Sequence, residues 1–288
     1  MSIIGLGRAG GALSLALKDD LDIRTLVFRD SPPAVIENVF GSDRFITWQN
    51  LSSIDTDILI ISTPDQEIRS SADKIATFKN LPSVALHLSG SLSSDELSAL
   101  RVRGVSVGSM HPLVSLSDPV RGSKNFADAY FCLEGDEIAL EAANEIVGVL
   151  GGRPFTIDTS LKPFYHASAV MASGHLTALL DSAFEMLTEC GLSLEKAREI
   201  LFPLIDSTIA NLRDQPGERA LTGPFARGDL DAFHRHLASF EGKLDPKIRD
   251  VYLALAARSV DLARRADHRR ERLDELSKAI SVAKENAE

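Results

Sequence analysis

Two hydrophobic patterns divide the chain. Up to about residue 158, short apolar runs alternate with amphipathic stretches, which is typical of βαβ units wound into a parallel sheet. Amphipathic stretches such as Gly10–Leu17 and Glu137–Leu150 predict the helices of these units. The runs expected to form strands are Ile3–Leu6, Thr25–Phe28, Phe45–Thr47, Ile58–Ser62, Val84–Leu88, Ser106–Ser109, Ala129–Glu134 and Arg153–Ile157.

The second pattern begins at about residue 160, where apolar residues recur every three or four positions over long stretches. The helical stretches it predicts are Phe164–Cys190, Leu194–Leu212, Ala232–Ser239 and Ile248–Ala283. We therefore predict two domains. Residues 1–158 form an α/β domain with a mostly parallel, doubly wound sheet, and residues 159–288 form an all-α domain.

Composition narrows the classes of protein that remain. The 288 residues are 44% hydrophobic, enough for a sizeable core, and the formal net charge of −10 disfavours nucleic acid or an anionic membrane as a partner. The strongly apolar run Ile58–Ile61 is far shorter than the roughly 20 residues that span a membrane. The start lacks the pattern of a secretory signal, and Cys132 and Cys190 are isolated. We expect a soluble, cytoplasmic protein.

A glycine loop follows the first predicted strand. It consists of Gly5, Leu6, Gly7, Arg8, Ala9 and Gly10, a G-x-G-x-x-G that opens a helix. The first glycine permits a tight turn, the second lets the backbone approach a pyrophosphate, and the third lets the helix pack against the strand. Unpaired backbone N–H groups at the helix start favour an anion. The loop predicts a dinucleotide-binding, Rossmann-like domain.

The end of the second predicted strand indicates which dinucleotide is bound. Arg29 and Asp30 are adjacent there, and only one of them can point at the adenosine ribose. An arginine pairs with the 2′-phosphate of NADP, whereas an acid accepts the ribose hydroxyls of NAD. Because Ser31 adds a small donor, we favour NADP(H) over NAD(H). A plain capping role for Arg29 at the sheet edge remains the alternative.

Two more strand ends carry small polar residues, where open α/β sheets place their ligands. Ser62, Thr63 and Pro64 follow the fourth strand, and Ser89 and Gly90 follow the fifth. We expect these loops to line the nicotinamide end of the cofactor, although either loop alone is equally consistent with a plain turn.

Several segments together resemble a known family. They are the glycine loop, Ile60–Asp65, His87–Gly90, Val107–Leu113, Tyr165–Ala169 and Leu221–Asp229. They are similar to two-domain bacterial proteins described as Rossmann-like with a carboxy-terminal domain of unknown function (number 2520). The resemblance implies an NADP-binding domain followed by a helical domain like those of the 6-phosphogluconate dehydrogenase superfamily, often dimeric through the helical part. Ser173 is a candidate substrate contact, although Gly174 follows it where many members have Asn.

A reductase also needs a group that moves a proton. Lys162 begins the first helix of the second domain, where burial and the helix end would lower its pKa. His166 lies four residues later on the same helix face, where superfamily relatives have an amide. A solvated lysine and a core imidazole are the alternative for this pair, and we expect the pair to face the cleft between the domains.

Other candidates are less specific. His111 follows a strand end and could orient a substrate, or be a turn histidine bonded to the backbone. Arg227 lies among turn formers and could hold a substrate carboxylate, or pair with Asp229 in a plain connection; the resemblance favours substrate binding. The histidine and cysteine spacings match no metal motif, so we expect no metal site.

These observations predict an NADP(H)-dependent oxidoreductase that acts on a small polar carbonyl, alcohol or imine in the interdomain cleft. The alternative from another class is a non-catalytic sensor or interaction module that binds NADP(H) without turning over a substrate. A reductase coupled to a deazaflavin is a third possibility that the glycine loop does not separate from the first.

Overall fold

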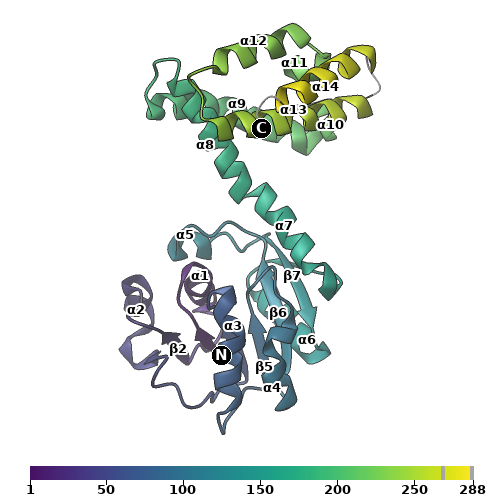
Figure 1. Ribbon diagram of the computed structural model, residues 1–288. Helices are drawn as coiled ribbons and strands as arrows, with labels where there is room; N and C mark the ends of the chain where they lie inside the picture. The colour runs from purple at the N-terminus through teal and green to yellow at the C-terminus, as the bar shows by residue number, and fades with distance from the viewer. Residues whose placement is uncertain (267–269, 286–288) are drawn as a thin grey trace. The chain divides into compact units, whose positions relative to one another are not determined.

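The computed structural model describes residues 1–266 and 270–285. The chain divides into two compact units, Met1–Ser173 and Gly174–Glu288 (Figure 1). Strands give way to helices between residues 156 and 159, where the sequence pattern changes. The first unit also includes the helix that follows, so its end lies beyond residue 158.

One sheet forms the centre of the first unit. Within the described residues its strands are β1 (Ser2–Ile4), β2 (Thr25–Phe28), β3 (Phe45–Thr47), β4 (Ile58–Ile61), β5 (Val84–His87), β6 (Ser106–Pro112), β7 (Tyr130–Gly135) and β8 (Arg153–Thr156). Their order is β3-β2-β1-β4-β5-β6-β7-β8, and all neighbours are parallel except β6 and β7. The strand order reverses direction between β1 and β4, and such a switch point is where doubly wound sheets bind ligands. The predicted fold class is confirmed.

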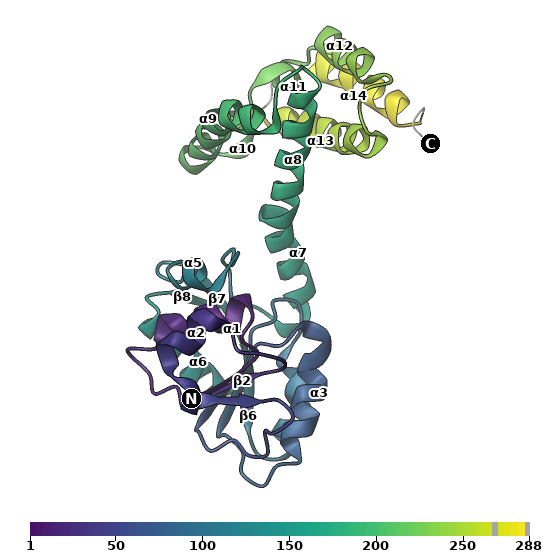
Figure 2. The ribbon, with the colours of Figure 1, turned by 90° about the vertical axis from the view of Figure 1, so that its left-hand side faces the viewer.

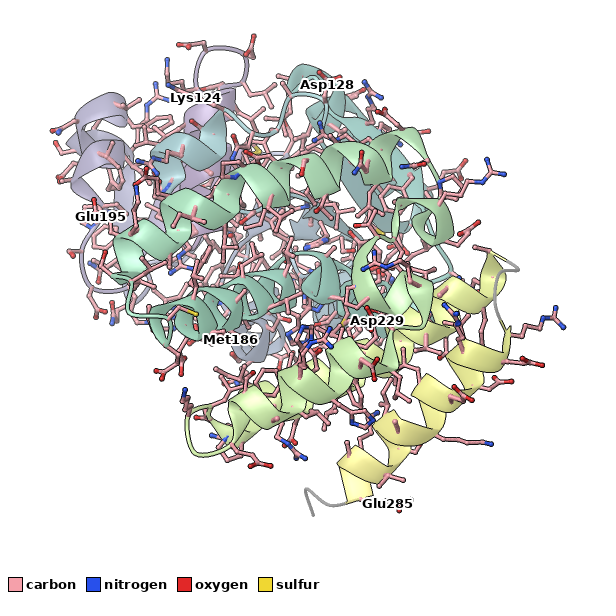
Figure 3. All side chains as sticks on the ribbon, turned by 90° about the horizontal axis from the view of Figure 1, so that it is seen from above. Lys124, Asp128, Met186, Glu195, Asp229 and Glu285 are labelled. Carbon is pink, nitrogen blue, oxygen red and sulfur yellow. The ribbon has the colours of Figure 1, made fainter. Side chains whose placement is uncertain are left out.

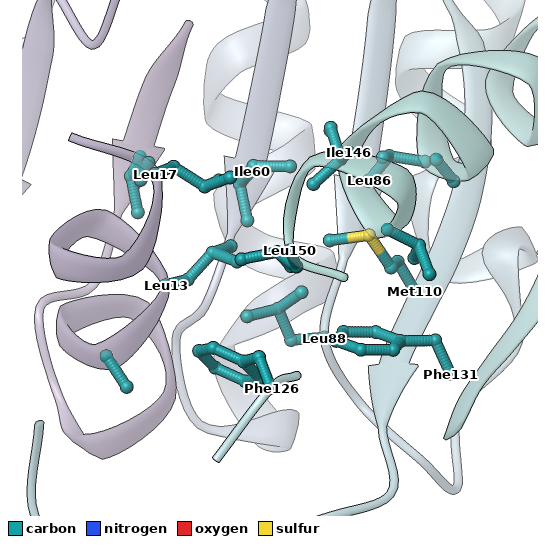
Figure 4. Close-up of a cluster of buried hydrophobic side chains, with 14 of the residues drawn as sticks. Leu13, Leu17, Ile60, Leu86, Leu88, Met110, Phe126, Phe131, Ile146 and Leu150 are labelled. Atoms are coloured by element: carbon teal, nitrogen blue, oxygen red, sulfur yellow. The ribbon is translucent and has the colours of Figure 1, made fainter. Parts of the chain in front are cut away.

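Helices cover both faces of this sheet (Figures 1 and 2). They include α1 (Arg8–Leu17), α2 (Ala34–Phe40), α3 (Asp65–Ala76), α4 (Ser98–Val102), α5 (Pro119–Ser123) and α6 (Glu137–Val149), with 3-10 turns η1 (Ser42–Arg44), η2 (Ser94–Leu97) and η3 (Thr159–Leu161). The last helix of the unit is α7 (Lys162–Ala172). Alternate strand residues enter two separate cores. Ile60 packs with Leu13 and Leu17 of α1 (Figure 4). Ile61 packs with Ile68 of α3 in the other core.

Several strand ends differ from the predicted ones, and two of these differences have local reasons. Strand β1 ends at Ile4 because Gly5 turns the chain with a φ of +88°. Strand β6 continues to Pro112, beyond the predicted Ser109, because the antiparallel neighbour β7 pairs with it as far as Phe131. This longer ladder carries His111 within a strand instead of in a turn.

The described part of the second unit is helical. Its helices are α8 (Gly174–Thr188), α9 (Leu194–Asp214), α10 (Gly217–Ala220), α11 (Gly223–Arg227), α12 (Leu230–Phe240), α13 (Pro246–Arg265) and α14 (Arg270–Glu285). Phe233 of α12, Leu253 of α13 and Leu276 of α14 belong to its buried core. Figure 3 labels Met186 on α8 and Asp229, whose carboxylate accepts a hydrogen bond from the Ala232 amide and so caps α12.

Two predicted helical stretches are interrupted. Ser173 adopts the non-helical angles φ −126° and ψ −76°, so Phe164–Cys190 is divided between α7 and α8. The stretch Ile248–Ala283 is divided between α13 and α14, and residues 267–269 within it lie outside the described residues. No helix in residues 1–266 or 270–285 is both long and apolar enough to cross a membrane.

Candidate active site

The three glycines of the loop have three different surroundings. A Cβ at Gly5 would lie 2.5 Å from the Ser62 carbonyl oxygen, and a Cβ at Gly10 would lie 2.0 Å from the Gly5 carbonyl oxygen. Nothing lies within 4 Å of a Cβ at Gly7. Gly5 and Gly10 are therefore required by packing inside the protein, whereas Gly7 leaves its space open to a ligand.

This loop borders a cleft of about 850 Å³ at the switch point between β1 and β4. The cleft is lined by the glycine loop, by the ends of β2 and β4, and by Trp48, Leu88 and Ser89. Its volume lies in the range of cofactor sites, roughly 300–1,000 Å³. The predicted residues Gly5 to Ala9, Arg29 and Ser62 to Pro64 therefore come together with Ser89 around one cavity.

The start of α1 suits an anion such as a pyrophosphate. The N-cap Gly7 provides no side-chain hydrogen bond, and the first turn contains no acidic residue. The first N–H groups of a helix have no partner within the helix, and its dipole favours negative charge there. Nearby, the buried Thr63 hydroxyl has no hydrogen-bond partner among the described residues. Open space, unpaired donors and an unpartnered hydroxyl in one cleft fit a phosphate-containing cofactor.

At the end of β2, Arg29 already has a partner. Its guanidinium donates to the carboxylate of Glu67 on α3, and both residues line the cleft. Asp30 and Ser31 are exposed there. On another part of the lining, the Lys74 ammonium lies 4.1 Å from the centroid of the Trp48 ring. A 2′-phosphate would compete with Glu67 for Arg29, a competition that sequence reasoning did not identify.

Lys162 occupies a different environment from the expected one. Its side chain is 0% exposed, and Nζ donates to the Ser89 carbonyl, the Ser109 hydroxyl and the Glu134 carboxylate, the last at 3.4 Å. Burial lowers the pKa of Lys162, and the Glu134 carboxylate opposes that shift. The pKa of Lys162 is therefore shifted in the expected direction. Its amine does not face an open cleft as expected, because the loop after β5 and the strands β6 and β7 enclose it.

Glu134 makes this enclosure a network. Its side chain is 3% exposed and accepts hydrogen bonds from the Ser94 amide at 2.7 Å and the Ser94 hydroxyl at 2.9 Å. Glu134 also lies directly opposite Ser109 in the β6–β7 ladder. Lys162 and Glu134 thereby connect α7 to three neighbouring parts of the sheet, and they hold the loop that carries Ser89 and Gly90.

Four residues gather beside that loop. Nδ1 of His111 lies 2.7 Å from the Tyr165 hydroxyl, and the His111 and His166 rings meet edge to face with centroids 5.8 Å apart. A Cβ at Gly90 would lie 2.7 Å from His111 Nε2 and 2.6 Å from His166 Cδ2. The structure therefore brings together the predicted residues His111, His166 and Gly90 and adds Tyr165 to them.

Burial determines the protonation of two histidines here. Desolvation, reinforced by the charges of His166 and Lys162, lowers the pKa of His111 to about 4. Desolvation likewise lowers the pKa of His87 to about 4, and its ring accepts from the Ser89 amide at Nδ1 and lies 3.0 Å from the Ser93 carbonyl at Nε2. At neutral pH both imidazoles are uncharged.

The remaining predicted residues lie elsewhere. Ser173 follows α7, and its hydroxyl donates to the Ala169 carbonyl at 3.0 Å. Arg227 is an exposed residue of α11 in the second unit, where Asp229 caps α12. Among the described residues no group of three or more His, Cys, Asp or Glu side chains is arranged to hold a metal ion.

Sequence reasoning missed Tyr165, Glu134 and Glu67. Glu134 gave a signal, because it ends a run of apolar residues that forms a buried strand. Tyr165 directly precedes His166, but adjacent helix residues point in different directions, so sequence did not indicate a shared partner. Glu67 gave no signal.

Comparisons with known proteins are consistent with this architecture. The family described as Domain of unknown function (DUF2520) matches residues 129–259. A search of curated protein sequences found no match. The match supports the resemblance over that region and names no activity.

Solved structures share the fold at low identity. A protein of Thermotoga maritima has a TM-score of 0.70 at 22% identity, covering 93% of this chain and 99% of that one. A Bacteroides fragilis protein named provisionally as an NADP oxidoreductase has a TM-score of 0.73 at 20% identity, covering 88% and 95%. Pyrroline carboxylate reductase of Plasmodium falciparum, solved with NADP bound, has a TM-score of 0.57 at 12% identity, covering 97% and 98%.

Proposed function

We propose that the chain is an NADP(H)-dependent oxidoreductase for a small polar carbonyl, alcohol or imine. The observation that carries this proposal is the glycine-loop cleft at the switch point, which is lined by Ser89. The next residue, Gly90, lies against the imidazoles of His111 and His166. The Bacteroides and Plasmodium proteins, whose names refer to NADP, support the choice of cofactor.

Different residues of the cleft bind different parts of the cofactor in this proposal. Amides at the start of α1 bind the pyrophosphate in the open space at Gly7. Arg29 exchanges Glu67 for the 2′-phosphate. The loops Ser62–Pro64 and Ser89–Gly90 border the nicotinamide. When bound, NADPH would supply a hydride to the substrate carbon.

The substrate heteroatom must take a proton when its carbon is reduced. His111 and His166 hold the proton-carrying groups nearest to Gly90, whereas the enclosed amine of Lys162 does not face this position. We therefore assign proton handling to the imidazoles. Lys162 is a positioning residue, which with Glu134 fixes the loop on which Ser89 and Gly90 lie.

Fluorescence titration tests the cofactor assignment, because Trp48 is the only tryptophan and lines the cleft. We expect saturable binding of NADPH, tighter than that of NADH. Gly7→Ala should keep the fold, since its Cβ meets nothing, and should weaken NADPH binding by about 10–100-fold through lost phosphate contacts. Gly148→Ala, on an open face of α6, is the matched control. Absence of saturable binding would refute the assignment.

Turnover is tested separately with a panel of keto acids, aldehydes, semialdehydes and cyclic imines. NADPH oxidation with any member supports the enzyme. Tight NADPH binding without oxidation of any member would favour the sensor or interaction module.

We further propose that the chain forms a homodimer through its helical unit. Leu204 of α9 is 61% exposed, and Ile200, Phe202 and Leu212 on the same helix are also exposed. So much apolar surface on one helix favours a second copy as its partner. Sedimentation should give twice the mass of one chain, and Leu204→Glu should shift the protein toward monomer. A wild-type monomer would refute the dimer.

A further inference from the structure

The bond between His111 and Tyr165 leaves one edge of the imidazole free. Nδ1 is occupied by the phenol at 2.7 Å, and the two rings meet edge to face with centroids 5.6 Å apart. No described residue forms a hydrogen bond with Nε2, which lies on the Gly90 side of the ring. Nε2 thus lies against Gly90, and the ring can take this position because glycine has no side chain.

Both partners of the bond are neutral near pH 7. Burial raises the pKa of the Tyr165 hydroxyl, so the phenol keeps its proton. Burial lowers the pKa of His111, and the neighbouring His166 and Lys162 lower it further against the opposing charge of Asp65. A phenol O–H is a better donor than a neutral imidazole N–H, and imidazole nitrogen is a better acceptor than phenol oxygen. Tyr165 therefore donates to Nδ1.

A neutral imidazole carries one proton, so occupation of Nδ1 as an acceptor leaves the proton on Nε2. His87 in the same unit follows this rule. Its Nδ1 accepts from the Ser89 amide at 3.1 Å, and its Nε2 lies 3.0 Å from the Ser93 carbonyl oxygen, to which it then donates. Fixing a tautomer through Nδ1 thus recurs on the neighbouring strands β5 and β6 of one sheet.

We propose that Tyr165 is a positioning residue that fixes His111 as the Nε2–H tautomer, with this N–H on the Gly90 side of the ring. Resting on the proposed function, the inference assigns that N–H as the donor to a carbonyl oxygen or imine nitrogen of the substrate. Gly90 is a specificity-determining residue in this arrangement, because any side chain there would meet both His111 and His166.

The molecule contains a matched control. In the second unit, Nδ1 of His236 lies 2.7 Å from the Tyr252 hydroxyl, and burial raises the pKa of Tyr252 to about 12. The rings are again edge to face, with centroids 6.0 Å apart. Removing this hydroxyl should change the tautomer of His236 and nothing in the first unit.

The test is imidazole nitrogen NMR of the full chain labelled with ¹⁵N-histidine at pH 7, with His111→Gln to assign the signals. Wild-type His111 should be the Nε2–H tautomer. Tyr165→Phe should convert it to a mixture of tautomers, and Tyr252→Phe should leave it unchanged. A wild-type Nδ1–H tautomer, or an unchanged His111 signal in Tyr165→Phe, would overturn the proposal.

This readout needs neither cofactor nor substrate, so it fails independently of the proposed function. Where a substrate is turned over, Tyr165→Phe should lower kcat and leave the dissociation constant of NADPH unchanged. If Tyr165→Phe gives the expected mixture of tautomers but leaves kcat unaltered, the Nε2–H of His111 does not donate to the substrate.

Discussion

The two units contain the same histidine–tyrosine hydrogen bond in different settings. His111 bonds Tyr165 between a strand and a helix, next to a glycine and a second imidazole. His236 bonds Tyr252 between α12 and α13, and Phe240 meets the Tyr252 ring with centroids 5.0 Å apart. The bond length, 2.7 Å, is the same in both.

The difference lies in what surrounds the free edge of each imidazole. Near His111 the chain supplies Gly90, a neighbouring cleft and a buried Lys162–Glu134 network that fixes the loop. Near His236 the aromatic neighbours belong to helix packing. A histidine–tyrosine pair is a candidate site only where a neighbouring cleft and a rigid surrounding structure accompany it.

We expect the largest effect from removing the buried Lys162–Glu134 ion pair. Glu134→Gln leaves the buried Lys162 ammonium without its carboxylate, and we expect the free energy of unfolding of the first unit to fall by about 3–5 kcal/mol. Urea unfolding followed by Trp48 fluorescence measures this. Asp274→Asn removes one of the two exposed carboxylates that pair with Arg264 in the second unit, where helix circular dichroism should show a loss of about 0–1 kcal/mol. Equal losses of unfolding free energy in the two variants would contradict the distinction between the buried and the exposed ion pair.

Acidification should weaken the first unit next most strongly. The folded pKa values of His87 and His111, about 4, lie below the unfolded value of 6.5, so the unfolded chain binds more protons between those values. Stability is therefore complete above pH 6.5 and falls by a few kcal/mol toward pH 4, on the order of the shifts. Urea unfolding at several pH values measures this loss, and His87→Gln should reduce it. A flat profile would be inconsistent with two buried neutral imidazoles.

A side chain at Gly90 tests the free edge directly. Gly90→Ala would place its Cβ 2.7 Å from His111 Nε2, displacing both imidazoles, and should reduce turnover by about 10²-fold. Steady-state kinetics with a substrate from the panel measures this. Gly148→Ala should leave turnover unchanged. A fully active Gly90→Ala enzyme would show that the imidazoles of His111 and His166 do not take part in the reaction.

The smallest effect distinguishes the two tyrosines. Tyr165→Phe removes one neutral hydrogen bond and should lower kcat by about tenfold or less. Tyr252→Phe removes the equivalent bond in the second unit and should leave kcat unchanged. Equal reductions in kcat would mean that both hydroxyls act through folding alone.

Sequence predicted the first unit well because its signals are local. The apolar runs around Leu26 and Ile60 and the glycine loop each depend on neighbours in the chain, and they appear as β2, β4 and the start of α1. The same reasoning placed Lys162 at a helix start. It did not find the enclosure of Lys162, because Ser89 comes from the loop after β5, Ser109 from β6 and Glu134 from β7, which only the folded sheet brings together.

The cluster at Gly90 shows the same limit. His111 and His166 were candidates by residue type, but their proximity depends on the antiparallel extension of β6 and on α7. The roles of Arg227 and Ser173 stay predictions, because no contact in either unit assigns them a ligand.

Amide hydrogen exchange of the full chain with and without NADPH tests the central claim most directly. The account predicts that NADPH protects the peptides covering residues 5–11 and 62–65 and leaves those covering residues 230–240 unchanged, and that Gly7→Ala loses this protection. No protection of the glycine loop at a saturating NADPH concentration, or equal protection in Gly7→Ala, would contradict it.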